Sequence, residues 1–399
     1  MTQTLIARQP ILDVRQNVYG YEILYRDPGN PDSAPRGAAD KATSSVLVDL
    51  FTNLDLDRFL GGHRPFINLT KNTLLQLADH PVGVGRLVVE VLENVPADEE
   101  VEGAIRRLKQ EGVEVALDDF MLDTEHRRLA PLVDFIKVDI RAFSREQLSA
   151  QAKELAGMPA RLLAEKVETR EEWEYCRELG FELFQGFFFA RPVTTRHRRI
   201  PTNRAQVLRL VARLQDPQVG VEELADLVSQ DVTLSYRLLR LINSAYFPIR
   251  EEVETIRRAA VLLGIQGLRT WVTWIALSRF DDKPAELRVV TLTRARMCGL
   301  LAEEAGLAED QGFLVGLFST LDALMDTSMT EVLAHLPLAE TVRDALIDRA
   351  GPAGALLNTV EAHERGDWLL LEQAGWEPGR LADAYVEATE WAEELNATV

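Results

Sequence analysis

The 399-residue sequence has only two cysteines and six histidines, and it lacks a long apolar segment. Cys176 and Cys298 lie far apart and no CxxC pair occurs, which argues against a disulfide scaffold and a thiolate zinc site. The histidines form no HExxH-type pair. No run approaches the roughly 18 to 20 apolar residues of a membrane-spanning helix, and residues 1–14 lack the apolar core of a signal peptide. We therefore expect a cytoplasmic protein without a membrane segment.

Basic residues are outnumbered by acidic ones: 44 lysines and arginines stand against 63 aspartates and glutamates, which gives a formal net charge of −19. Broad binding to nucleic acid depends on lysine and arginine side chains that neutralise phosphates. The one basic cluster, RPVTTRHRR at residues 191–199, is interpreted as a solvated linker. We therefore expect no nucleic-acid partner.

The first half of the chain alternates short β-branched runs with longer amphipathic stretches. Two of these stretches, residues 98–112 and 169–180, end in glycine, a common helix stop. This alternation predicts a parallel sheet covered by helices. The number of runs favours a closed TIM-like (β/α)8 barrel over an open sheet. The expected strands span residues 4–11, 18–25, 65–69, 86–91, 113–118, 134–140, 161–167 and 182–189.

After residue 200 the strand-like runs stop, and apolar residues recur at helical spacing. The expected helices span residues 203–216, 220–231, 233–247, 255–264 and 265–280. Composition and length favour two domains. We predict a barrel over residues 1–195 and an all-α domain over residues 196–399.

Polar side chains stand in or directly after nearly every expected strand. They are Glu22, Asn68, Glu90, Asp118, Asp119, Lys137, Glu165 and Gln185. Functional residues of β/α barrels gather at the C-terminal ends of the strands. One acidic residue there is more often a helix cap or a solvated charge, but chance explains a full set poorly. Carboxylate and amide oxygens suit Mg²⁺, Mn²⁺ or Ca²⁺, and adjacent aspartates suit a two-metal site for phosphodiester hydrolysis.

These runs carry motifs that resemble the EAL domain, the cyclic-di-GMP phosphodiesterase family. Glu22-Ile23-Leu24 stands where the name-giving Glu-Ala-Leu occurs. The segments FINLT, VVEVLEN, LDDF, FIKVDI, AEKVET and FQGFFFARP resemble the family's other motifs. The resemblance covers residues 3–193 and implies a barrel that binds cyclic-di-GMP together with Mg²⁺ or Mn²⁺.

The same resemblance implies a role for each matching residue. The metal ligands would be Glu22, Asn68, Glu90, Asp118 and, for a second ion, Asp119. The catalytic residues would be Glu165, which positions or deprotonates the attacking water, and Lys137, which orients it. The ligand-binding residues would be Arg26, Gln185 and Glu168, and Glu93 would support the loop after the paired aspartates.

The sequence departs from the EAL pattern near the paired aspartates. Active members continue into a glycine-rich DFGTG loop, whereas this chain has Met121 and Leu122, which cannot take glycine-only dihedral angles. Lys166 replaces the family's glycine in AEKVE. These changes affect the surroundings of the ligand set and leave the ligands themselves in place. We therefore predict that binding is retained more fully than turnover.

The second half resembles the HDOD domain, a relative of HD-type metal phosphohydrolases that lacks their His and Asp ligands. The match is carried by EELADLVSQDVTLSYRLLRLINSAYF and IRRAAVLLGIQGLRTWV. Phe318 and Ser319 stand where an HD hydrolase would place its His-Asp pair, and phenylalanine cannot ligate a metal. We expect a non-catalytic domain that engages an unidentified protein partner.

Two hypotheses of different class follow. In the first, the chain is a cyclic-di-GMP signalling protein whose degenerate EAL domain binds the nucleotide, with slow hydrolysis left open. In the alternative, it is an inactive scaffold that binds no nucleotide and acts through protein contacts alone. The oligomeric state is left open, with a homodimer as one option.

Overall fold

The computed structural model describes residues 5–26, 55–80, 86–121, 125–191, 202–244, 247, 252–280 and 282–398. The chain forms two compact units. Unit 1 contains residues 1–188 and also residues 362–386, and unit 2 contains residues 189–361 and 387–399. The predicted limits, 1–195 and 196–399, do not anticipate that a segment near the C-terminus belongs to unit 1.

Unit 1 is built on a closed eight-stranded barrel in the order β1 to β8, as the sequence predicted. The strands are β1 Leu5–Asp13, β2 Val18–Arg26, β3 Arg64–Leu69, β4 Val88–Val91, β5 Glu114–Leu117, β6 Phe135–Asp139, β7 Arg161–Glu165 and β8 Leu183–Gln185. Neighbouring strands from β2 to β8 pair in parallel. β1 is the exception to the expected parallel barrel, because it runs antiparallel to both β2 and β8. Only residues 14–17 join β1 to β2, and so short a turn cannot hold a crossover helix.

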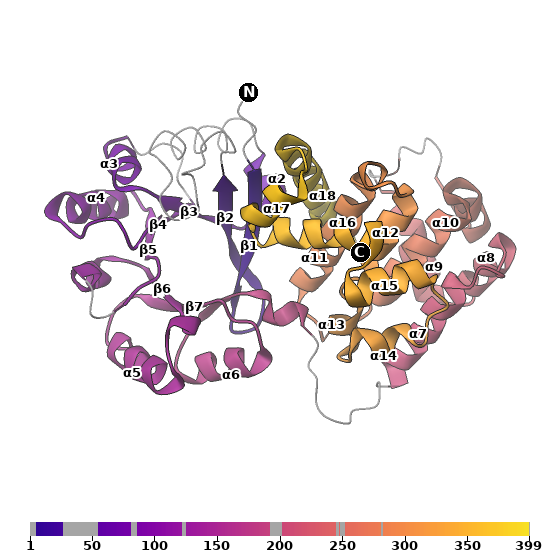
Figure 1. Cartoon of the computed structure of the whole chain (residues 1–399), viewed down its shortest axis with the longest axis horizontal. Helices are drawn as coiled ribbons and strands as arrows, with labels where there is room; N and C mark the ends of the chain where they lie inside the picture. The colour runs from indigo at the N-terminus through magenta and orange to yellow at the C-terminus, as the bar shows by residue number, and fades with distance from the viewer. Residues whose placement is uncertain are drawn as a thin grey trace. The chain divides into compact units, whose positions relative to one another are not determined.

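The helices of unit 1 begin at side-chain caps and pack outside the strands (Figure 1). Within residues 1–188 they are α2 Leu56–Phe59, α3 Lys71–Asp79, α4 Glu99–Gln110, α5 Arg145–Leu155 and α6 Arg170–Glu178. α4 starts at Asp98, whose carboxylate accepts from the Val101 N–H, and α6 starts with a capping box between Thr169 and Glu172. The helices expected at 98–112 and 169–180 are therefore confirmed. Their N-terminal caps fix the residue at which each helix begins.

One layer of apolar side chains fills the barrel interior. It consists of Ile11, Phe66, Val88, Ala116, Phe135, Leu163 and Leu183. Side chains alternate between the two faces of a strand, so the residue two positions further on points into the same interior. On β3 to β8 that residue is the polar one singled out from the sequence, from Asn68 after Phe66 to Gln185 after Leu183. The polar layer thus rests directly on a packed apolar floor.

Within the described residues, unit 2 contains helices and no strand. The helices are α7 Thr202–Gln215, α8 Val221–Ser229, α9 Val232–Ile242, α10 Ile256–Leu277, α11 Ala285–Leu300, α12 Glu309–Phe318, α13 Leu321–Met325, α14 Met329–Leu333, α15 Glu340–Asp348 and most of α16 Gly351–Glu364. α17 Trp368–Ala374 belongs to unit 1, and α18 Pro378–Thr398 has residues in both units. The two helices expected at 255–264 and 265–280 are confirmed as the two parts of α10, which Gly264 separates with the non-helical angles φ 67° and ψ 177°.

α10 is long and apolar enough to cross a membrane by length and composition alone. However, 56% of its most apolar window is buried inside the structure, as in the core helix of a soluble protein. The helix is therefore weak evidence for a membrane segment. The expected cytoplasmic location stays a prediction.

Candidate active site

Four carboxylates from different strands converge on one buried lysine. The Lys137 Nζ lies 2.9 Å from Glu90 Oε1 and from Asp118 Oδ1, and 3.1 Å from Glu22 Oε2 and from Glu165 Oε1. Lys137 and Glu90 have no exposed side-chain surface. The strand-end rule therefore predicted a cluster that the fold does assemble, with the ammonium at its centre.

Amide side chains complete this layer. Asn68 Nδ2 donates to Glu22 Oε1 at 2.9 Å, and Gln185 Nε2 donates to Glu22 Oε2 at 2.7 Å. Gln185 Nε2 also donates to Gln9 Oε1 at 3.1 Å. Gln9 pairs with Glu22 across the β1–β2 ladder. Because β1 is antiparallel, its polar residue precedes its apolar layer residue, Ile11, instead of following it.

Burial and mutual repulsion shift the pKa values of this cluster. Burial, followed by the charge of Glu22, raises the pKa of Glu90 well above its usual range. Burial also raises the pKa of Glu165 to about 8, although Lys137 opposes the shift. For Lys137, burial favours the neutral amine, but the surrounding carboxylates, Asp118 first, outweigh burial and raise its pKa. The lysine is therefore charged, and it offsets part of the acidic ring.

Several oxygen atoms of the ring are suited to a hard cation. Glu90 Oε2, Asn68 Oδ1 and Gln185 Oε1 are buried and accept no hydrogen bond. Buried acceptors without donors are costly, and carboxylate and amide oxygens are the ligands that Mg²⁺ and Mn²⁺ prefer. Among the described residues no group of three or more His, Cys, Asp or Glu side chains is already arranged as a metal cluster. The donor set thus fits a divalent cation by its chemistry, while the ammonium of Lys137 lies among the carboxylates.

Backbone strain is concentrated at the same edge of the barrel. Asp119 has φ 43° and Lys166 has φ 58°, both in the left-handed region that favours glycine. Lys166 stands where the EAL pattern has glycine, and its ammonium pairs with Asp139 at the end of β6. Such conformations cost on the order of 1 to 3 kcal/mol each and occur mostly at functional sites.

A pocket of about 490 Å³ opens over the polar layer. It is lined by Gln9, Glu22, Leu24, Asn68, Glu93, Asp118, Asp119, Arg141, Glu165, Lys166, Glu168, Gln185, Gly186, Phe187, Arg365, Gly366 and Trp368. Most of the predicted site residues line this one pocket, including Glu168 and Glu93. Glu168 also pairs with Arg141 at 3.3 Å. Arg26 is not among the lining residues.

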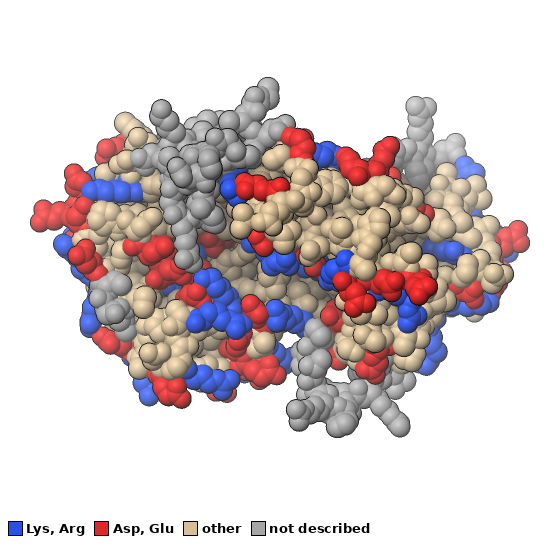
Figure 2. Space-filling model, viewed as in Figure 1, with Lys and Arg blue, Asp and Glu red and all other residues tan. Residues whose placement is uncertain are grey.

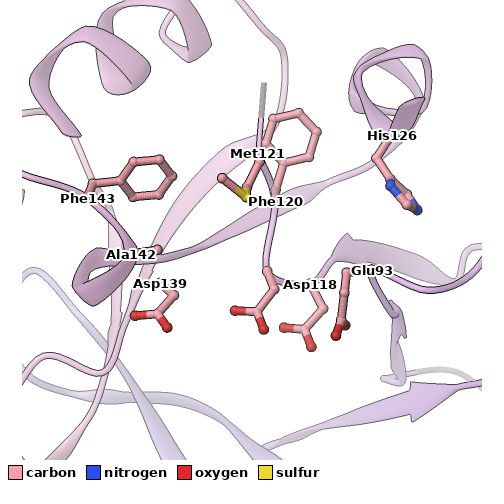
Figure 3. A pocket seen from close by; sticks show the side chains of 9 residues that line it. Glu93, Asp118, Phe120, Met121, His126, Asp139, Ala142 and Phe143 are labelled. Atoms are coloured by element: carbon pink, nitrogen blue, oxygen red, sulfur yellow. The ribbon is translucent and has the colours of Figure 1, made fainter. Parts of the chain in front are cut away.

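A second pocket of about 390 Å³ lies beside the paired aspartates and shares Glu93, Asp118 and Asp119 with the first. Figure 3 shows the carboxylates of Glu93, Asp118 and Asp139 pointing to one side, with Phe120, Met121 and Phe143 on the other. The Phe120 N–H donates to the Lys137 carbonyl at 3.0 Å, and the Phe120 carbonyl accepts from Gln151 Nε2 at 3.0 Å. The loop is therefore anchored at Phe120. Leu122 lies outside the described residues.

Some pocket residues were missed from the sequence. Asp139 is the last residue of β6, two residues after Lys137, and the strand-end rule could have found it. Gln9 was not predicted as a site residue because β1 was assumed to run parallel to its neighbours. No local sequence pattern marks Arg365, Gly366 and Trp368 as pocket residues, because only the tertiary fold places them in unit 1.

Comparison with known proteins agrees with this architecture. The EAL-domain family model matches residues 37–192, and the HDOD-domain family model matches residues 200–341. The cyclic di-GMP phosphodiesterase CdgJ of Vibrio cholerae is 34% identical over 409 residues, which cover 100% of this chain and 94% of CdgJ. The chain belongs to the EAL–HDOD family.

Other proteins are similar to the chain over all or part of its length. YuxH of Bacillus subtilis, an uncharacterized protein, is 28% identical and covers 98% of this chain and 99% of its own length. The crystal structure of the Bacillus subtilis YkuI protein, which has an EAL domain and is in complex with substrate c-di-GMP and calcium, is 19% identical. It covers 65% of this chain and 71% of that chain, with a TM-score of 0.39. The EAL family match begins at residue 37, so the place of Glu22 in the site rests on the barrel geometry.

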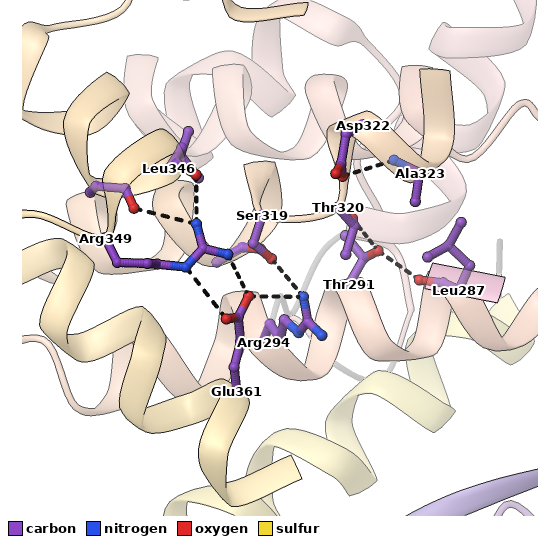
Figure 4. A network of polar contacts seen from close by, with 12 residues as sticks. Leu287, Thr291, Arg294, Ser319, Thr320, Asp322, Ala323, Leu346, Arg349 and Glu361 are labelled. Atoms are coloured by element: carbon purple, nitrogen blue, oxygen red, sulfur yellow. Dashed lines mark hydrogen bonds and ion pairs between the residues drawn. The ribbon is translucent and has the colours of Figure 1, made fainter. Parts of the chain in front are cut away.

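Phe318 and Ser319, at the positions where the sequence resemblance would place a His-Asp metal pair, take part in the packing of unit 2. Phe318 is fully buried at the end of α12. Ser319 Oγ donates to the Gly316 carbonyl at 2.7 Å and lies 3.4 Å from Arg294 Nη1. Arg294 also contacts Glu361, and Arg349 Nη2 pairs with that carboxylate at 2.8 Å (Figure 4). This network links α11, the end of α12, the end of α15 and α16.

Proposed function

We propose that the EAL barrel binds cyclic-di-GMP together with Mg²⁺ or Mn²⁺ and hydrolyses one of its phosphodiester bonds slowly. The observation that carries the proposal is the convergence of Glu22, Glu90, Asp118 and Glu165 in one buried layer beneath a pocket. The sequence relationship to CdgJ, a cyclic di-GMP phosphodiesterase, supports the choice of ligand.

The residues of the chain would divide the chemistry as follows. Glu22, Asn68, Glu90 and Asp118 would hold a first divalent ion and Asp119 a second, and such ions activate bound water and stabilise charge on phosphate oxygens. Lys137 Nζ donates hydrogen bonds at the centre of the layer and would orient the attacking water. Glu165 would position or deprotonate the attacking water, and the raised pKa of its carboxyl, about 8, makes it a stronger base than an exposed glutamate.

Slow turnover is inferred from the surroundings of this set. Lys166 puts a side chain, an extra ammonium and backbone strain where the EAL pattern has glycine. Met121 follows the paired aspartates, with 40% of its surface exposed at the neighbouring pocket. A misplacement of about 1 Å in a reacting group can cost on the order of a hundredfold in rate.

The HDOD domain would act by binding a protein partner. Buried Phe318 and hydrogen-bonded Ser319 stand where an HD hydrolase would have its metal ligands, which supports a role without catalysis. Val232 and Tyr236 lie one helical turn apart on α9 and are 82% and 64% exposed. These two side chains offer an exposed apolar contact that such a partner could cover.

Isothermal calorimetry with cyclic-di-GMP, with and without Mg²⁺, tests the binding step, and product analysis for the linear dinucleotide tests hydrolysis. We expect metal-dependent binding, slow turnover, and loss of all phosphodiesterase activity in Glu90→Gln. Activity that persists in Glu90→Gln would place catalysis outside the barrel layer. A wild-type chain that binds no nucleotide under either condition would instead support the inactive scaffold.

A further inference from the structure

Three residues from near the C-terminus form part of the wall of the EAL pocket. Arg365, Gly366 and Trp368 line it together with Glu22, Asp118 and other barrel residues. They lie outside both family-matched ranges, 37–192 and 200–341. They belong to the compact unit that contains the barrel. The pocket is therefore completed by residues that are not part of the matched EAL segment.

Specific contacts hold this wall to the barrel. Gln9 Nε2 donates to the Arg365 carbonyl at 3.2 Å, while Gln9 Oε1 accepts from Gln185, which also binds Glu22. Gly366 has φ 66°, and a Cβ atom there would lie 2.8 Å from Leu24 Cδ1. The wall is thus linked through two glutamines to the acidic layer, and glycine permits its close approach to β2.

Further along the chain, Tyr385 fixes the returning segment to β1. The Arg8 N–H donates to the Tyr385 hydroxyl at 3.3 Å, and the Tyr385 ring packs edge-on against Phe59 at 6.1 Å between centroids. Arg365 and Trp368 therefore occupy a defined position relative to the barrel.

The basic residues of the pocket differ in their partners. Arg141 pairs with Glu168 and Glu172, and Lys166 pairs with Asp139. Arg365 is exposed, and no carboxylate in the described part of the chain pairs with its guanidinium. Most of the charged residues that line the pocket are acidic. An arginine without a carboxylate partner there is suited to an anionic ligand, because guanidinium groups bind phosphate oxygens well.

Arg26, which was expected to contact a ligand phosphate, forms an ion pair within the protein. Arg26 Nη2 lies 2.7 Å from Glu372 Oε1 on α17, with the arginine side chain only 12% exposed. Arg26 Nε is buried and makes no hydrogen bond. The Glu372 carboxylate therefore occupies one of the donor nitrogens that a phosphate would need.

We propose that residues 365–372 form a second half of the cyclic-di-GMP site, in which Arg365 binds a ligand phosphate and Glu372 competes with the ligand for Arg26. This inference rests on the proposed function. It assigns ligand binding to a segment outside the EAL match and predicts that the two substitutions Arg365→Gln and Glu372→Gln act in opposite directions.

The test is calorimetry of the whole chain with cyclic-di-GMP in Ca²⁺. Arg365→Gln should weaken binding about tenfold or more, as expected when a charge-assisted hydrogen bond is lost, and Arg365→Lys should recover part of it. Glu372→Gln should tighten binding by about two- to fivefold, the range of a partly exposed ion pair, and this gain should vanish in the Arg26→Gln background. Arg106→Gln, the same charge change on an exposed side chain of α4, should leave affinity unchanged.

The outcomes separate the two proposals. If the wild-type chain binds the nucleotide and Arg365→Gln binds it equally well, the inference is wrong and the proposed function stands. If neither the wild type nor Glu372→Gln binds it, the proposed function fails and the inference fails with it. A parallel weakening by Arg106→Gln would show a general charge effect and would also overturn the inference.

Discussion

Replacing Lys137 by methionine isolates the electrostatics of the acidic layer. The substitution keeps most of the aliphatic chain and removes an ammonium that contacts four carboxylates at 2.9 to 3.1 Å. Removing one partner of a buried ion pair typically costs about 3 to 5 kcal/mol, because the remaining charge is left unpaired. We expect a loss of this size in the free energy of unfolding near neutral pH and without divalent cations.

The loss should depend on pH. Without the ammonium, the pKa values of Glu90 and Glu165 rise further above their values in the unfolded chain. A raised carboxyl pKa stabilises the fold below the unfolded pKa, and this contribution is lost as the pH rises through the folded pKa. Lys137→Met should therefore be more destabilised at about pH 8 than at about pH 6.

Divalent cations should partly restore the variant. A metal that binds only the folded state stabilises it by mass action, and without the ammonium the carboxylates bind a cation with less competition. Urea unfolding with and without Mg²⁺ measures both effects. Lys109→Met, which breaks a partly exposed pair with Asp134, is the control and should cost no more than about 1 kcal/mol. Equal stability of Lys137→Met and wild type at the higher pH, or an equal Mg²⁺ response, would refute this account of the layer.

Three further predictions follow from other parts of the structure. Glu90→Gln should blunt the rise in melting temperature that Mg²⁺ or Mn²⁺ produces, and an undiminished rise would count against the metal site. His363 is fully buried, and burial lowers the pKa of its imidazole to about 3. A lowered histidine pKa stabilises the fold above the pKa of the unfolded chain, and this stability is lost as the pH falls. At pH 5 protonation of the unfolded chain should therefore destabilise the wild type by about 2 kcal/mol. His363→Phe should remove this pH dependence in urea unfolding, whereas His80→Gln, at an exposed site, should retain it. Hydrogen exchange across residues 220–280 should change when cyclic-di-GMP binds, and unchanged protection despite binding would show that the two units are independent.

The polar layer could be predicted from the sequence because it follows a local rule. Strands alternate their faces, and the apolar floor and the polar layer differ by two residues on each parallel strand, as in Phe135 and Lys137. The direction of β1 could not be predicted in this way, because a tight turn reverses the strand while its apolar pattern stays the same. For that reason Gln9, which joins Glu22 and Gln185 in space, was not recognised.

The helical pattern near the C-terminus has a different limit. Periodicity shows that a helix has one apolar face, but it does not show which core buries that face. Residues 362–386 therefore read as a continuation of the helical domain, although Tyr385 hydrogen-bonds to the backbone of Arg8. The positive φ of Asp119 could not be predicted either, since backbone strain arises only when surrounding contacts hold the residue in place. The positive φ of Lys166 had one sign in the sequence, because Lys166 stands where the EAL pattern has glycine.

The charged side chains that line the pocket determine what an anionic nucleotide would need in order to bind there. Its lining includes six carboxylate side chains and three basic ones, and two of those, Arg141 and Lys166, already pair with carboxylates. On the face shown in Figure 2, acidic and basic side chains are likewise intermingled rather than separated into a basic field. The phosphodiesters of cyclic-di-GMP are anionic, so a pocket of this composition repels them unless cations are added. Divalent ions would supply most of that charge and Arg365 the remainder. Affinity should therefore fall steeply in a chelator, and the nucleotide that still binds there should depend on Arg365 more strongly than it does with the metal present.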